Sequence, residues 1–209
     1  INIKEAVYLW KADHMDFWLL VTTFFATLLL GIEYGIALGV GVSLIVLIFR
    51  TTRPYTTELG KVPNSNFYRN KARFSDVLLE NEILVFRFDA QLFYANASYF
   101  RDELEKMTDT KGDDLKLIVL DAESINRIDS TGVEILKDRI KYYHKKGVLF
   151  YFAGVKGPVR DALFRGKILS LIDINHFFMR VNGAVNFFKT GDREHQKKYE
   201  HYIHQSQEY

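Results

Sequence analysis

The residues best placed to carry chemistry in this 209-residue chain form the turn Ile-Asp-Ser-Thr-Gly at residues 128–132. Thr131 and Glu134 have the spacing of a capping box, in which side-chain oxygens accept hydrogen bonds from the free N–H groups at a helix start. This spacing predicts that Thr131 caps a helix. Because such N–H groups also attract anions and phosphates, a binding or regulatory role is the alternative. The candidate regulatory residues are Asp129, Ser130, Thr131 and Gly132.

No other group of residues predicts catalysis or a cofactor site. The chain has no cysteine, which excludes disulfides and thiolate metal sites. His195, His201 and His204 have metal-binding side chains, but a solvated polar tail is the simpler interpretation. The run Gly39-Val40-Gly41 lies inside an apolar segment, so it does not indicate a dinucleotide-binding loop. We therefore expect no enzyme activity, no catalytic residue, no cofactor and no metal.

Charged residues are unevenly distributed along the chain. The 28 basic and 26 acidic residues give a net charge of +2, and the mean hydropathy is −0.09. These values argue against a disordered chain, a collagen-like chain and a strongly basic nucleic-acid binder. However, residues 17–49 contain a single charged residue, Glu33. The average therefore combines a membrane-like first quarter with a polar remainder.

The apolar region predicts a transmembrane helical hairpin over residues 16–50. Residues 17–30 and 32–49 would form helices of about 21 and 27 Å, against a bilayer hydrocarbon core of about 30 Å. The alternative is a helical hairpin buried in the core of a soluble ligand-binding domain. A signal peptide does not fit, because the apolar region is too long and lacks a small-residue cleavage site.

Small residues recur every four positions in the second apolar segment, at Gly31, Gly35, Gly39 and Ser43. In membranes, small residues at this spacing let helix backbones approach closely. We interpret them as helix-packing residues, and we expect them to pack against neighbouring helices. Lining of an ion pathway is the alternative.

The residues that flank the hairpin predict its orientation. Arg50 and Arg53 follow the second segment, so the positive-inside rule places both ends of the hairpin in the cytoplasm. Residues 1–15 have one apolar helical face that includes Trp10, which predicts an interfacial amphipathic helix. A frayed segment without fixed structure is the alternative. The expected location is integral to a bacterial inner or plasma membrane.

Residues 51–190 alternate between strand and helix patterns, which predicts an α/β domain with a mainly parallel or mixed sheet flanked by helices. Residues 64–81 are polar and irregular, and residues 191–209 form a polar tail. The expected strands cover residues 55–62, 83–88, 115–120, 148–153 and 177–181. The expected helices begin near Asn96, Val133, Pro158 and Ala184.

The Asp-Ser-Thr-Gly turn, placed after LKLIVLDAESINRI and before VEILKDRIKYYHKKG, resembles the turn of STAS domains. These domains occur in bacterial anti-sigma-factor antagonists and in the SulP anion transporters. The upstream sequence LLLGIEYGIALGVGVSLIVLIFRTTRP resembles the last membrane hairpin of a SulP permease, and LVFRFDAQLFYANASYFRDEL resembles the first strands and helix of its STAS domain. The likeness covers about residues 1–190.

The resemblance implies the C-terminal part of a secondary transporter for sulfate or a related anion, working by symport or exchange. Such transporters have inverted membrane repeats and bind substrate near the midplane. The resemblance also implies a homodimer with cytoplasmic STAS domains in a regulatory or assembly role. The partners implied are the lipid bilayer, upstream helices of the same transporter, and a cytoplasmic protein or nucleotide at the STAS domain, but no nucleic acid. Substrate-binding residues are expected in upstream helices, so we expect no transport by this chain alone.

The resemblance leaves a second function open. In the antagonists, the serine that follows the aspartate is phosphorylated by a partner kinase, and that serine corresponds to Ser130 here. The alternative function is therefore a membrane-tethered STAS module for protein interaction, regulated by phosphorylation at Ser130.

Overall fold

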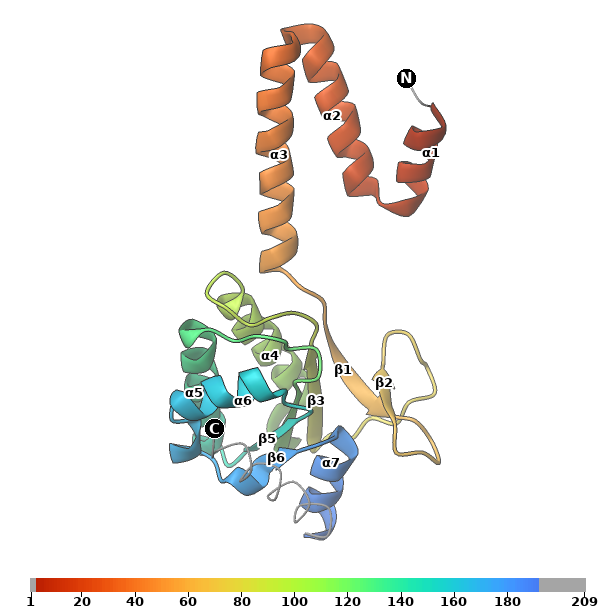
Figure 1. Ribbon diagram of the computed structural model, residues 1–209. Coiled ribbons are helices and arrows are strands. Elements are labelled where there is room, and N and C mark those ends of the chain that lie inside the picture. Colours follow the sequence, from red (N-terminus) through yellow and green to blue (C-terminus); the bar gives the residue numbers. More distant parts are fainter. Residues whose placement is uncertain (1–2, 192–209) are drawn as a thin grey trace. The chain divides into compact units, whose positions relative to one another are not determined.

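A computed structural model describes residues 3–191 of the chain (Figure 1). Apart from Gly191, the predicted polar tail, with its three histidines, therefore lies outside the described residues. The chain divides into two compact units, residues 1–53 and 54–209. We describe each unit by itself.

The first unit consists of three helices, α1 (Ile3–Ala12), α2 (His14–Leu30) and α3 (Ile32–Thr52). α3 is the one helix among the described residues that is long and apolar enough to cross a membrane, whereas α2 is shorter at 17 residues. Gly31 joins α2 and α3 with φ = +92°, a conformation that glycine adopts without a Cβ clash. Arg50 at the end of α3 pairs with Asp13 (2.7 Å) and Asp16 (2.9 Å) at the start of α2.

Two of the four small residues lie where α3 contacts α2. A Cβ atom added to Gly35 would lie 2.2 Å from Oγ1 and 2.6 Å from Cα of Thr27, so only glycine allows this approach. A Cβ added to Gly39 would lie 3.0 Å from the side chain of Thr23. Ser43 is exposed one turn further along α3. The helix-packing role of the whole stripe, Gly31 and Ser43 included, stays a prediction.

The second unit contains a six-stranded sheet in the order β2-β1-β3-β4-β5-β6. Strands β3 to β6 run parallel to one another, and β1 pairs antiparallel with both β2 and β3. This is the mixed sheet that the alternating pattern predicts. The strands are β1 (Thr56–Lys61), β2 (Tyr68–Asn70), β3 (Ile83–Phe88), β4 (Leu117–Asp121), β5 (Leu149–Ala153) and β6 (Phe177–Phe178).

Helices cover both faces of the sheet, which explains why its central strands are apolar on both sides (Figure 1). On β4, Ile118 and Leu120 join the larger core beneath α4, α5 and α6, whereas Leu117 and Val119 join a smaller core beneath α7. The helices are α4 (Ala97–Lys111), α5 (Ser130–Lys145), α6 (Gly157–Arg165) and α7 (Val181–Thr190). Short 3₁₀ turns occupy Gly112–Asp114, Ile168–Ser170 and Ile174–His176.

The α/β fold class is confirmed, and the differences from the sequence prediction are local. The region 64–81, expected to be irregular, contains β2, a three-residue edge strand too short and too polar to show a strand pattern. The last strand ends at Phe178 rather than Val181, because Val181 is the first residue of α7.

Candidate functional site

The Asp129–Gly132 turn begins helix α5, and the structure corrects the expected cap. Asp129, not Thr131, is the N-cap residue: its Oδ1 accepts a hydrogen bond from the backbone N–H of Gly132 (2.8 Å). Glu134 does not reach back to close a capping box, since its carboxylate pairs with Lys137 (2.8 Å). An aspartate can cap in place of the threonine because its carboxylate accepts from the third residue of the helix in the same way.

Asp129 also connects α5 to the loop that precedes α4. Its Oδ2 accepts a hydrogen bond from the N–H of Tyr94 (2.9 Å), and its own N–H donates to the carbonyl of Leu92 (3.2 Å). A Cβ added to Gly132 would lie 2.7 Å from that same carbonyl oxygen. Glycine is therefore required where the start of α5 packs against this loop.

Ser130 and Thr131 lie on the outer side of the turn. Both residues are exposed in the first turn of α5. Their position leaves the hydroxyls accessible to another protein, at the positive end of the helix dipole. The regulatory role expected for this turn stays a prediction.

A second polar cluster, which our sequence reasoning missed, lies at the carboxyl ends of β3 and β4. Asp121 ends β4 and is only 5% exposed. Burial, the largest cause, raises the pKa of its carboxyl. On β3, Arg87 pairs with Asp89 (2.5 Å) and donates to Ser124 Oγ (3.1 Å). An aspartate directly after the apolar run LKLIVL is the signal that would have revealed it, because ligands often bind at the carboxyl ends of parallel strands.

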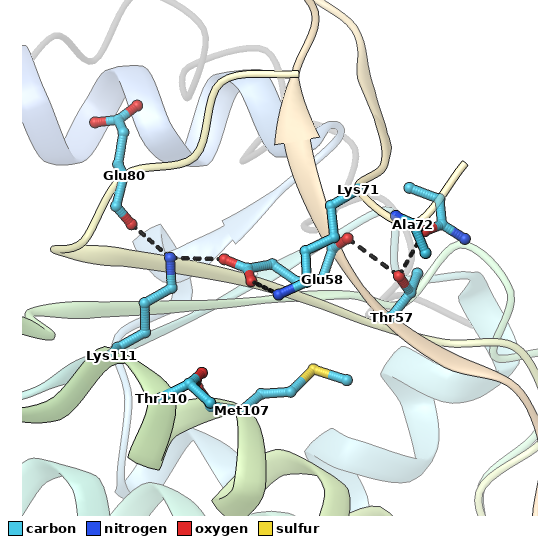
Figure 2. A network of polar contacts seen from close by, with 9 residues as sticks. Thr57, Glu58, Lys71, Ala72, Glu80, Met107, Thr110 and Lys111 are labelled. Carbon is cyan, nitrogen blue, oxygen red and sulfur yellow. Dashed lines mark hydrogen bonds and ion pairs between the residues drawn. The ribbon is translucent and has the colours of Figure 1, made fainter. Parts of the chain in front are cut away.

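A third polar cluster is buried between β1, the segment that precedes β3, and the end of α4 (Figure 2). Glu58 on β1 is 3% exposed, and its carboxylate pairs with Lys111 (2.7 Å) and Lys71 (2.5 Å). Lys111 also donates to the backbone carbonyl of Glu80 (2.7 Å). This cluster attaches β1 and the β1–β3 connection to α4, so its role is structural. Sequence reasoning missed it because its members are far apart in the chain.

No group of three or more His, Asp or Glu side chains in residues 3–191 is arranged to hold a metal ion.

Comparison with known proteins identifies the family of the second unit. A model described as the STAS domain matches residues 76–184, which is just over half of the chain.

Two plant proteins show a longer likeness. "Probable sulfate transporter 4.2" of Arabidopsis thaliana is 34% identical over 195 residues, and "Sulfate transporter 4.1, chloroplastic" of the same plant is 30% identical over 194 residues. Each alignment covers 88% of this chain but only 29% and 28% of the relatives. The chain therefore spans less than a third of the length of these relatives.

A solved structure shows the same fold. The murine Solute Carrier 26 family member A9 anion transporter, in its inward-facing state, matches with a TM-score of 0.75 at 24% identity. The match covers 87% of this chain and 30% of that chain. The family match shows that the chain belongs to the STAS domain family, and the plant relatives show that it is homologous to sulfate transporters of the SulP family.

Proposed function

We propose that this chain is the C-terminal part of a SulP-type secondary transporter for sulfate or a related anion, in which the STAS domain regulates or assembles the transporter. One observation carries the proposal. The likeness to the first sulfate transporter covers 88% of the chain, about 184 residues, whereas residues 54–209 number only 156. The likeness therefore extends into the apolar helical unit and is not confined to a STAS domain, which also occurs outside transporters.

Labelled-anion uptake into proteoliposomes tests this function. The protein encoded by the complete reading frame should take up at least one anion of a panel of sulfate, bicarbonate, chloride and a dicarboxylate, with saturable kinetics. The 209-residue chain alone should take up none, because we place the substrate-binding residues in membrane helices outside it. Uptake by the short chain, or no uptake by the complete protein, would contradict the proposal.

We propose that the chain lies in a bacterial inner or plasma membrane with its STAS domain in the cytoplasm. We also propose that it forms a homodimer. The orientation is supported by Arg50 in the last turn of α3 and Arg53 directly after it, since basic residues favour the cytoplasmic side. The absence of cysteine allows single-cysteine labelling without background. In sealed cells, an impermeant maleimide should label Glu33→Cys at the hairpin turn but not Ser98→Cys on α4. The reverse pattern would overturn the orientation, and a monomeric mass in detergent would overturn the dimer.

Regulation at Ser130 is the second candidate function, supported by the exposed position of Ser130 at the start of α5. A phosphate there adds charge and hydrogen-bond acceptors at a helix N-terminus. Ser130→Asp and Ser130→Ala should therefore differ in binding to a cytoplasmic partner. Ser98→Asp is the matched control, since Ser98 is an exposed serine in the first turn of α4. Equal binding by both Ser130 variants would remove this candidate.

A further inference from the structure

A pocket of about 580 Å³ opens on the α7 side of the sheet, near the carboxyl ends of β3, β4 and β5. Its wall runs from the β1–β2 hairpin to the N-terminus of α7. It shares no lining residue with the Asp129–Gly132 turn, so it is a separate feature of the domain. Asp121 and Arg87 of the second polar cluster lie in its wall.

Cationic side chains from three separate segments line this pocket. They are Arg69 on β2, Lys156 in the β5–α6 loop and Arg180 at the N-cap position of α7. Within residues 3–191, none of the three forms an ion pair, and Lys156 bonds only to the side-chain amide oxygen of Asn126. Arg180 lies next to a helix N-terminus that no side chain caps. Cations without an ion pair that line one pocket beside a helix N-terminus favour an anion.

Two polar groups in the pocket wall are buried without a hydrogen-bond partner among the described residues. They are the hydroxyl of Tyr68 and the amide oxygen of Asn182, which is the second residue of α7. Buried polar groups are normally hydrogen-bonded, so these two atoms have bonding capacity that a ligand or a water molecule in the pocket can satisfy. Burial, the largest cause, and the Glu80 carboxylate raise the pKa of Tyr68 to about 12, so its hydroxyl remains a donor at neutral pH. A half-turn of the Asn182 amide would likewise present an N–H donor.

The acidic side chains in the same wall do not cancel this positive charge. Asp121 and Glu123 also line the pocket, but they face Arg87, the fourth lining cation. The four lining cations and two lining carboxylates, together with Asp89, which pairs with Arg87, leave a net charge of +1. Exposed apolar side chains of Phe67 and Met179 form part of the rim. The arrangement thus combines a cationic centre with an apolar edge.

We propose that this pocket binds a tetrahedral oxyanion, phosphate or sulfate, either free or as the ester group of a small organic molecule. Arg69, Lys156 and Arg180 would hold the anion, with Tyr68 and the Asn182 amide donating further hydrogen bonds. Phe67 and Met179 would contact the organic part of an ester. Binding at this site is independent of the transport proposal, because every residue involved lies in the second unit.

Isothermal titration calorimetry on the whole 209-residue chain in detergent micelles tests the site. The probes are sodium sulfate, sodium phosphate and phenyl phosphate, each at an ionic strength held constant with chloride. At least one probe should bind saturably, and the double variant Lys156→Gln/Arg180→Gln should weaken it at least tenfold. Arg69→Gln is a second, independent pocket variant. These side chains are exposed, so the fold should be retained, which circular dichroism checks.

Arg165→Gln is the matched control, because it removes one exposed cation at the end of α6, outside the pocket. It should leave the affinity within twofold of the unchanged chain. Comparable binding of all three probes would assign the site to free inorganic anions, and at least tenfold tighter binding of phenyl phosphate would assign it to phosphate esters. No saturable binding of any probe, or equal weakening by Arg165→Gln and the pocket variants, would overturn the proposal.

Discussion

Removal of the Lys111 charge should destabilise the STAS unit more than removal of any exposed lysine on the same helix. Lys111 is 8% exposed and is paired with Glu58, which is 3% exposed (Figure 2). Breaking a buried ion pair by removing one partner costs about 3–5 kcal/mol, because the other charge stays buried. Lys71 still neutralises part of the Glu58 charge in the Lys111→Met variant. We therefore expect a loss of about 3 kcal/mol, the lower end of that range.

Urea unfolding of the chain in detergent micelles, followed by circular dichroism, measures this loss. In a separate thermal unfolding experiment on a unit of this size, a loss of about 3 kcal/mol corresponds to a fall of roughly 6–12 °C in the midpoint. Lys106→Met is the matched control on α4, because Lys106 is 73% exposed and lies 3.6 Å from Glu103. Exposed pairs contribute about 0–1 kcal/mol, so the control should stay close to the unchanged chain.

A double variant separates the buried charge from side-chain packing. If an uncompensated Glu58 carboxylate causes the loss, then Glu58→Leu/Lys111→Met should recover most of the stability lost in Lys111→Met. Lys71 is half exposed and can be solvated when Glu58 is replaced. Equal effects of Lys111→Met and Lys106→Met, or a double variant that is less stable than Lys111→Met, would refute the reasoning.

Three further predictions concern single groups. Asp129→Ala removes the α5 cap and its bond to the α4 loop, so urea unfolding should show a loss of about 1–2 kcal/mol, and an unchanged midpoint would contradict the assigned cap. Burial raises the pKa of Asp121 above its unfolded value, so stability falls as pH rises through that interval, and Asp121→Asn should raise the thermal midpoint at pH 7. Burial, the largest cause, lowers the pKa of both His144 and His176, so the unfolded chain binds protons first as pH falls below about 6.5. The thermal midpoint should therefore fall between pH 7.5 and 5.5, and His144→Asn/His176→Asn should reduce that fall.

The overall fold could be predicted because its signals are local. An apolar run such as LKLIVL, followed by an amphipathic helix that ends near Gly147, indicates a βαβ unit without knowledge of distant contacts. The edge strand β2 shows no local strand pattern, because it has only three residues, Tyr-Arg-Asn, and this is too short for an apolar/polar alternation to appear. Its formation depends on β1, which reaches it through tertiary pairing.

The turn at the start of α5 could be located from sequence, but its hydrogen bonds could not be assigned. Both Asp129 and Thr131 have side chains that cap helices, and their spacing to Glu134 favoured the threonine. The loop that carries Leu92 and Tyr94 decides between them, because it contacts Asp129 from another part of the chain. The Glu58 cluster and the anion pocket were missed for the same reason.

On the function that we propose, the STAS domain regulates or assembles an anion transporter of which this chain is a part. The most direct test compares initial rates of labelled-sulfate uptake by the complete protein and by a version that ends after Arg53, at equal amounts in the membrane. We expect uptake by the complete protein, and a clear loss of uptake rate or of dimer in the shortened one. Equal uptake and equal assembly by the two proteins would contradict it.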